Sequence, residues 1–312
     1  MCGLRFSVEP HATDATCRWS RGEGLNRDFI SDLLTLQHQG ARGYALLRLV
    51  LTMDALAALE AVISARIDGV RDQPFAVPDF DNTCIVNDVG EATLAFMCRN
   101  HLLRCGELLP SGAQPCSPAY HEQVFRHYHQ LLDRGDIRSA SLLCAGILAG
   151  FRRDEAAAAV SAALDAEGTV PGETELYGLP VARGLVVRPG LRRLIDFSTA
   201  SNVQIWIVSA SPEIAVESAM HRFGLGGNLI ALRHRIEDGV LARALDEPHS
   251  IAEGKVDCIK TFIDASRRPL FAVGDSVHDL PMVEYADLHA VVERDDALTQ
   301  EARRRGWFVL PC

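Results

Sequence analysis

The stretch PFAVPDFDNT, residues 74–83, decides the fold of this chain. Its apolar part, Phe75–Val77, is a short run of the kind that forms a buried strand. Pro78 marks the end of the run, because proline cannot donate a hydrogen bond to a neighbouring strand. The loop that follows carries four polar side chains, of which Asp79, Asp81 and Thr83 are candidate site residues. We therefore predict a buried strand that delivers two carboxylates and a hydroxyl to one end of a sheet.

From residue 184 to the C-terminus, short apolar runs alternate with helical segments. The runs predicted as strands are LVV (185–187), VQIWIV (203–208), NLIAL (228–232), PLFAV (269–273), LHAVV (288–292) and WFVL (307–310). The pair Asp238-Gly239 predicts a hairpin turn after the third of these runs. Strands that alternate with helices form a parallel sheet covered by helices on both faces. The predicted fold class is therefore α/β.

A helical block follows the first strand, from residue 88 to about residue 165. Its four segments are EATLAFMCRNHLL (91–103), YHEQVFRHYHQLLD (120–133), IRSASLLCAGILAGF (137–151) and RDEAAAAVSAALDA (153–166). Turn-forming residues, PGETELYGLPVARG (171–184), close the block. The block separates the first strand from the rest of the sheet, so we predict that it is an insertion.

This pattern divides the chain into three parts. Residues 74–84 and 184–312 form the α/β catalytic core, and residues 85–183 form a helical cap inserted after the first core strand. Residues 1–73 form an N-terminal helical extension. Its helices either pack on the core or offer a surface for a homodimer.

Composition narrows the class of protein. The 31 basic and 41 acidic residues give a net charge of −10, which argues against nucleic-acid binding but leaves small phosphorylated substrates open. The nine cysteines include no Cys-x-x-Cys pair, and no histidine cluster has zinc spacing, so free thiols in a reducing compartment are expected. The N-terminus lacks the apolar core of a signal peptide, and no apolar stretch is long enough to span a bilayer. We expect a cytoplasmic protein with no membrane partner.

Polar residues stand at the ends of the predicted strands, where ligands bind in sheets of this kind. They are Asp79, Asp81, Thr83, Ser209, Lys255, Asp275 and Asp279. Asp79 and Asp81 lie two residues apart and point to the same side of an extended backbone. One can therefore attack as a nucleophile while the other moves protons. Asp275 and Asp79 supply hard oxygen ligands, which suit Mg²⁺ and not zinc.

Two further residues are suited to holding an anion. Ser209 lies where a strand turns into a helix, so its hydroxyl and the next backbone N–H groups, starting with Ala210, can hold a phosphate. Lys255 adds a positive charge that offsets the crowding of carboxylates and phosphate oxygens. Together with the carboxylates, these groups predict metal-assisted phosphoryl transfer.

The order of these motifs resembles the haloacid dehalogenase superfamily. Its Asp-x-Asp, Ser/Thr, Lys and paired acidic motifs match DFDNT (79–83), VSAS (208–211), GK (254–255) and GDSVHD (274–279). The resemblance covers residues 75–312 and implies a Rossmann-like three-layer core. The chain resembles the phosphoserine phosphatase branch, which has a helical cap between the first two motifs, and is most similar to phosphorylcholine phosphatases. The shared stretches are DFDNT followed by Glu91, EQVFRHYHQLL, LLCAGILAGF, AEGK, FIDASRRPLFAVGD and RGWFVLP.

The resemblance implies a role for each motif residue. Asp79 is the nucleophile and Asp81 the general acid and base. The implied substrate-binding residues are Thr83, Glu91, Ser209, Ala210 and Lys255. The implied Mg²⁺ ligands are Asp79, Asp81, Asp275 and Asp279, the last of these directly or through water.

Specificity is expected to come from the cap. In the phosphorylcholine phosphatases the residue that matches Glu91 lies near the substrate's positively charged head group. The cap helix carries only Tyr128 between His127 and His129, and aromatic residues make up 6% of the chain, which disfavours a cage for choline and favours a smaller amine. Glu91 can alternatively be a first-turn helix acid, and the two histidines can be a solvated face.

The predicted function is hydrolysis of a small phosphomonoester by a Mg²⁺-dependent phosphatase that forms an aspartyl-phosphate. Phosphoserine, phosphoethanolamine and phosphocholine are candidate types of substrate. Two alternatives stay open. One is phosphoryl transfer to an acceptor other than water, and the other is a non-enzymatic phosphate-binding regulator that acts through the N-terminal helices.

Overall fold

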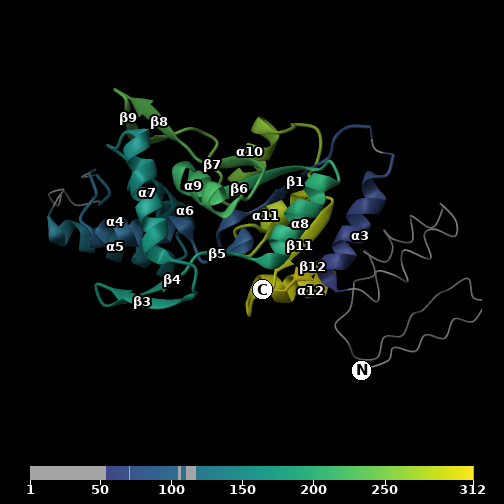
Figure 1. Ribbon diagram of the computed structural model, residues 1–312, viewed down its shortest axis with the longest axis horizontal. Helices are drawn as coiled ribbons and strands as arrows, with labels where there is room; N and C mark the ends of the chain where they lie inside the picture. The colour runs from purple at the N-terminus through teal and green to yellow at the C-terminus, as the bar shows by residue number, and fades with distance from the viewer. Residues whose placement is uncertain (1–53, 70, 105–106, 110–116, 312) are drawn as a thin grey trace, which may run out of the picture.

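A computed structural model describes residues 54–69, 71–104, 107–109 and 117–311 (Figure 1). The first described helix is α3 (Ala55–Ile67), which Asp54 caps by accepting a hydrogen bond from the Ala57 N–H at 2.9 Å. The other predicted N-terminal helices, and the homodimer surface assigned to them, lie outside the described residues. No helix in the described part of the chain is long and apolar enough to cross a membrane.

The centre of the fold is a six-stranded sheet in which every neighbouring pair is parallel. Its strands, in spatial order, are β12 (Phe308–Leu310), β11 (Leu288–Val292), β10 (Phe271–Gly274), β1 (Phe75–Pro78), β6 (Gln204–Pro212) and β7 (Asn228–Leu232). The predicted first strand, β1, therefore lies between two strands that come much later in the chain. All four of its residues are buried, as expected for a strand covered on both faces.

Helices cover both faces of this sheet. They are α8 (Pro189–Ala200), α9 (Glu213–Phe223), α10 (Gly254–Phe262), α11 (Leu280–Tyr285) and α12 (Ala297–Arg305), together with α3. Alternate residues of β1 face the two layers: Phe75 and Val77 pack with Ile259 of α10 and Met282 of α11, whereas Ala76 belongs to the core under α3, α8 and α9. The predicted three-layer α/β core is confirmed.

Four helices fall between β1 and β6 in the sequence and gather at one end of the sheet (Figure 1). They are α4 (Val89–Arg99), α5 (Pro118–Asp133), α6 (Ile137–Gly146) and α7 (Arg153–Glu167). The chain enters this block through β2 (Ile85–Val86) and leaves it through β5 (Val186–Val187), and these two strands pair in antiparallel fashion. The division into a core (74–84 and 184–312) and a cap (85–183) stays our interpretation of this arrangement.

Two local predictions were wrong. Residues 171–184, predicted as turns, form a hairpin of β3 (Gly172–Leu176) and β4 (Leu179–Arg183). Its tight turn uses positive φ at Tyr177 and Gly178, and a tyrosine there gives no turn signal. The LVV run does not join the main sheet, because β5 pairs with β2. The hairpin at Asp238-Gly239 is confirmed, between β8 (His234–Glu237) and β9 (Val240–Leu245).

Candidate active site

The end of β1 delivers Asp79 to the centre of the sheet edge. The Asp79 N–H donates to the Val273 carbonyl of β10 at 2.9 Å, which extends the strand by one residue. A tight irregular turn, η2 (Phe80–Cys84), follows, and Asn82 adopts a positive φ within it. Asp79 and Asp81 are both buried, with 5% and 9% of their surface exposed. Two carboxylates are therefore withdrawn from bulk water at the strand end that the sequence predicted.

Three carboxylates from two strand ends form a cluster. Each of Asp79, Asp275 and Asp279 offers an oxygen within 4.8 Å of the other two, and all three residues are buried. The pKa of Asp79 is raised to about 8, chiefly by burial and in part by the charges of Asp279 and Asp275, against the opposing effect of Lys255. Crowded carboxylates of this kind fit a divalent cation that prefers oxygen ligands, so the residues present fit Mg²⁺.

Lys255 neutralises part of this cluster. Its Nζ donates to Asp79 Oδ1 and to Asp279 Oδ1, both at 2.6 Å. Burial alone would lower the pKa of Lys255, but the two carboxylates outweigh burial and hold its pKa above the usual value. The preceding Gly254 has to be glycine, because a Cβ there would lie 2.1 Å from the His249 carbonyl oxygen. The Gly-Lys motif thus lets α10 approach closely enough to place the ammonium group.

Asp279 and Asp275 are held by the loop after β10. Asp279 Oδ2 accepts hydrogen bonds from the Asp275 N–H at 3.2 Å and from the N–H and hydroxyl of Ser276 at 3.2 and 3.1 Å. Gly274 makes room for this arrangement, since a Cβ there would lie 2.3 Å from the Asp279 Cβ. This loop therefore fixes Asp279 through its Oδ2 atom, while its Oδ1 atom accepts from Lys255 within the cluster.

Asp275 has two further partners. Thr83 Oγ1 donates to its Oδ1 at 3.3 Å, and Arg294 forms an ion pair with its Oδ2. The predicted substrate contact of Thr83 stays a prediction, because its buried hydroxyl is directed at Asp275 here. Sequence reasoning missed Arg294, although it follows β11 closely and the strand-end rule could have found it.

The carboxylate of Asp81 lies outside the three-residue cluster. Its Oδ1 accepts from the Val89 N–H at 2.7 Å and its Oδ2 from the Ser209 hydroxyl at 3.1 Å. Burial raises the pKa of Asp81 well above its usual value, and the charges of Asp88 and Asp79 add to this effect. A raised pKa favours the protonated carboxyl group, which is the form that can act as a general acid. Its predicted contact with the metal stays a prediction.

Ser209 connects β6 to this site. Its hydroxyl accepts from the Ser211 N–H at 3.0 Å, and its carbonyl accepts from the Ser250 hydroxyl at 2.6 Å. Ser209 is fully buried, whereas the neighbouring Ala210 is half-buried and packs against the cap. Ser211, which also hydrogen-bonds Asp81, was not among the predicted site residues. Two serines at the end of β6, Ser209 and Ser211, thus hydrogen-bond the Asp81 carboxyl group from the core.

A second acidic group lies where α4 begins. Asp88 caps the helix by accepting from the Glu91 N–H at 2.8 Å. Burial raises the pKa of Glu91 to about 7, and the charges of Asp88 and Glu167 contribute to that rise. Glu91 Oε1 lies 3.7 Å from His129 Nε2, and burial lowers the pKa of His129. Asp88 was missed by sequence reasoning, although an Asp directly before a helical run is a common cap.

The cap and the core meet closely at this point. A Cβ at Gly90 would lie 2.9 Å from Ser211 Oγ of the core and 3.0 Å from Cys144 Sγ of α6. Buried Tyr128 of α5 lies near the same charges, and burial raises the pKa of its phenol well above the usual value, with Asp88 and Glu91 contributing. His129 packs against Phe125, with ring centroids 4.5 Å apart, so the interpretation of His129 as a solvated face is wrong.

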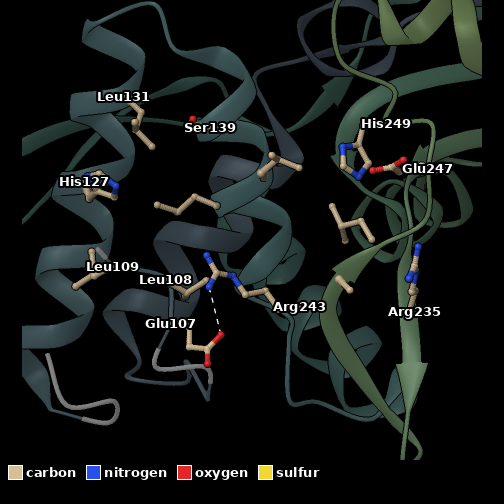
Figure 2. Close-up of a pocket in the computed structure, with 14 residues that line it drawn as sticks. Glu107, Leu108, Leu109, His127, Leu131, Ser139, Arg235, Arg243, Glu247 and His249 are labelled. Atoms are coloured by element: carbon tan, nitrogen blue, oxygen red, sulfur yellow. Dashed lines mark hydrogen bonds and ion pairs between the residues drawn. The ribbon is translucent and has the colours of Figure 1, made fainter. Parts of the chain in front are cut away.

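A separate pocket of about 700 Å³ lies between the cap helices and the β8–β9 hairpin (Figure 2). It includes His127 and Arg243, and Arg243 forms an ion pair with Glu107 across its wall. None of the motif carboxylates, nor Ser209 or Lys255, lines it. The structure therefore places His127 away from the carboxylate cluster.

Comparisons with known proteins agree with this geometry. A family model described as haloacid dehalogenase-like hydrolase matches residues 76–284. The chain is 35% identical over 107 residues to a probable phosphatase of Mycobacterium tuberculosis. The aligned segment covers 33% of this chain and 37% of that protein. The chain is 25% identical over 123 residues to a phosphoserine phosphatase of the same organism, which covers 38% and 40% of the two chains. The matched segment therefore spans about two fifths of these relatives.

Two solved structures are similar to this chain, and at their low sequence identity they support the fold alone. A protein of unknown function from Anaerococcus prevotii is 19% identical, with a TM-score of 0.61 over 82% of this chain and 91% of that one. A second, from Bordetella pertussis, is 20% identical with a TM-score of 0.59 over 77% and 99% of the two chains. Both extend the likeness beyond the segment matched in the mycobacterial proteins.

Proposed function

Because the chain belongs to the haloacid dehalogenase-like hydrolase family, we propose that it is a Mg²⁺-dependent phosphatase that hydrolyses a small phosphomonoester. The observation that carries the proposal is the position of Asp79. It lies at the end of the central strand, 2.6 Å from Lys255 and within a cluster of two further buried carboxylates. A nucleophile, a fixed cation and a set of oxygen ligands for Mg²⁺ thus meet at one point.

In the proposed mechanism Asp79 attacks phosphorus. A bond forms between an Asp79 oxygen and phosphorus while the bond from phosphorus to the leaving-group oxygen breaks, and Asp81 gives that oxygen a proton. A water oxygen then bonds to phosphorus while the bond from phosphorus to the Asp79 oxygen breaks, and Asp81 takes a proton from that water. Phosphate leaves, and the Asp79 carboxylate is regenerated. Mg²⁺, held by Asp79, Asp275 and Asp279, would supply positive charge against the phosphate oxygens.

The remaining residues hold this machinery in place. Ser209 orients the Asp81 carboxyl group, and Lys255 holds Asp79 at the strand end while offsetting the charge of a bound phosphate. Thr83 and Arg294 position Asp275. We propose Ala210 as a backbone contact to phosphate, since it follows Ser209 in the last part of β6, where the strand register shifts shortly before α9 begins.

The cap side of the site favours a cationic leaving group. Asp81, Asp88 and Glu91 are carboxyl groups in or beside it whose pKa values burial raises. Within the described ranges, none of the three has a Lys or Arg ion-pair partner. The basic group beside Glu91 there is His129, whose pKa is lowered. A substrate ammonium group would supply the missing positive charge. We therefore propose an amine-bearing phosphomonoester of the phosphoethanolamine, phosphoserine or phosphocholine type.

A substrate panel tests the proposal. Phosphate release should be measured for phosphoethanolamine, phosphoserine, phosphocholine, glycerol phosphate and sugar phosphates, with Mg²⁺ and with chelator. Glu91→Gln should raise KM for the amine esters by about tenfold and leave p-nitrophenyl phosphate unchanged. Glu122→Gln, on the exposed side of α5, is the matched control. If neutral sugar phosphates are the best substrates and Glu91→Gln changes no KM, the amine assignment is wrong.

The same assays separate the two alternatives. Transfer to an acceptor other than water would yield a new phosphate ester in place of inorganic phosphate. A non-enzymatic phosphate-binding protein would bind phosphate but turn over none of the esters. Release of inorganic phosphate that depends on Asp79 supports hydrolysis over both.

A further inference from the structure

His129 of the cap carries a buried nitrogen that makes no hydrogen bond. The residue lies on α5, and in the part of the chain that the structure describes its Nε2 atom has no hydrogen-bond partner. Its ring packs against two others, with centroids 4.5 Å from that of Phe125 and 5.4 Å from that of Tyr128. Buried polar atoms are almost always paired, so an unpaired nitrogen on a packed ring requires an explanation such as a role in binding.

The group that faces this nitrogen is the carboxyl group of Glu91. Glu91 Oε1 lies 3.7 Å from His129 Nε2, which is too far for a hydrogen bond. Burial raises the pKa of Glu91 to about 7. Burial also lowers the pKa of His129 despite the charge of Asp133, so the imidazole is mostly neutral at pH 7. A neutral imidazole with its proton on Nδ1 presents Nε2 as an acceptor, so two acceptor atoms then face each other.

These two acceptors lie on the cap side of the proposed general acid. Val89, two residues before Glu91, donates its N–H to Asp81 Oδ1 at 2.7 Å. Tyr128, which precedes His129, lies close enough to Asp81 and Glu91 for the charges of both to raise the pKa of its phenol. In the proposed mechanism Asp81 protonates the leaving-group oxygen, so we expect the rest of the leaving group to extend to this side.

The separation of the two acceptors suits a single ammonium nitrogen. Hydrogen bonds from a charged nitrogen are about 2.7–2.9 Å long. A nitrogen about 2.9 Å from each of two atoms 3.7 Å apart makes an angle of about 80° between them. The N–H bonds of an ammonium group are about 109° apart, so each hydrogen bond bends by roughly 15° and stays above about 150° at the hydrogen. One ammonium group can therefore donate to both acceptors.

Resting on the proposed function, we propose that Glu91 and His129 select leaving groups whose ammonium carries at least two N–H bonds, one for each acceptor. His129 is then a specificity residue that accepts through Nε2, while Glu91 supplies the second acceptor and the negative charge. The trimethylated ammonium of phosphocholine satisfies the charge but has no N–H to donate. Of the three candidate types of substrate, this favours phosphoethanolamine and phosphoserine over phosphocholine.

A methylation series on the wild-type chain tests the selection. Phosphoethanolamine, its N-methyl and N,N-dimethyl derivatives and phosphocholine carry three, two, one and no N–H bonds. We expect similar kcat/KM for the first two esters. The value should then fall by at least about tenfold for the dimethyl ester and by about tenfold again for phosphocholine, because each loss leaves one buried acceptor unpaired.

Variants of His129 test which residue makes the selection. His129→Phe keeps the packing against Phe125 and Tyr128 but removes the acceptor. It should lower the ratio of kcat/KM for phosphoethanolamine to that for phosphocholine by about tenfold, through KM. His129→Gln keeps an acceptor of similar reach and should preserve the ratio. His127→Phe, on the same helix but lining the separate pocket, is the matched control and should also preserve it.

The outcomes separate this inference from the proposed function. If the wild type hydrolyses phosphocholine as well as phosphoethanolamine, the inference is wrong while the amine assignment stands. An unchanged ratio in His129→Phe that melts like the wild type would also overturn it, because loss of packing alone affects both esters alike. If neutral esters are hydrolysed and no amine ester is, the proposed amine substrate is wrong and the inference fails with it. The methylation series needs no variant, so it decides the question even if His129→Phe does not fold.

Discussion

Replacing Lys255 by methionine tests how the active site balances its charges. Methionine keeps an unbranched side chain of similar reach but removes the ammonium group that lies 2.6 Å from both Asp79 and Asp279. The two carboxylates stay buried without their cation. Loss of one partner from a buried ion pair costs about 3–5 kcal/mol of unfolding free energy. At about 2–3 °C per kcal/mol for a chain of this size, the melting temperature should fall by about 6–15 °C in metal-free buffer.

Mg²⁺ should restore part of this stability. The ion brings positive charge back to the same carboxylates, so it should raise the melting temperature of Lys255→Met more than that of the wild type. Turnover should still fall by about 10²–10³, because the fixed cation beside the nucleophile is gone. Scanning calorimetry with and without Mg²⁺, together with phosphate release, gives all three quantities.

The control is Lys260→Met, at an exposed position on the same helix. It should change the unfolding free energy by no more than about 0.5 kcal/mol. A loss of less than about 2 °C in metal-free Lys255→Met would refute the reasoning. So would a Mg²⁺-dependent rise of equal size in variant and wild type, because the ion would then not replace the lysine charge.

Four further predictions follow from the site. Asp79→Asn should lower turnover by at least about 10³, measured by phosphate release, and retention of a tenth of the activity would contradict the covalent mechanism. Chelation should abolish activity, and Mg²⁺ should restore it. Ca²⁺ should restore activity poorly, because it takes more ligands at longer distances. Full activity in excess chelator would refute the metal assignment. Asp81→Asn should slow esters with poor leaving groups more than p-nitrophenyl phosphate, and equal losses for both would count against Asp81 as the general acid. Burial raises the pKa of Glu91 from 4.5 to about 7, so the charged form of Glu91 destabilises the fold at higher pH. Glu91→Gln should therefore raise the unfolding free energy by up to about 3 kcal/mol at pH 8 and change it little below pH 4.5. A series of denaturation curves over pH checks this, and the absence of such a trend would be evidence against a buried carboxylate.

The sheet was predictable because its strands are buried on both faces. A strand such as β1 has to be apolar throughout, so it stands out against amphipathic helices without any alignment. The carboxyl ends of parallel strands lie on one edge, which is why Asp79, Ser209 and Asp275 could be grouped before their distances were known. The hairpin at Tyr177-Gly178 escaped prediction, because its turn relies on a positive φ at a tyrosine.

Side-chain partners that cross between elements were not predictable. The strand-end rule could mark Arg294 as a candidate, but its contact with Asp275 exists only because β11 lies beside β10, an order that the sequence does not reveal. Asp88 could be recognised as a helix cap, but its closeness to Asp81 depends on how α4 enters the site. Local pattern identifies the elements, whereas contacts between distant segments require the packed structure.

The central position of β1 also determines the order in which the chain can fold. Phe75 pairs with Gln204, and Val77 pairs with Ala272, so both neighbours of β1 are made more than a hundred residues after it. At about 5–20 residues per second, the ribosome needs roughly 6–26 s to reach the nearer of these partners. During that interval β1 has no strand to pair with, while the helices of residues 89–167 can already form from local contacts. We therefore expect the helical insertion to fold first during synthesis and the nucleophile-bearing strand to be enclosed late, when β6 and β10 arrive on either side of it.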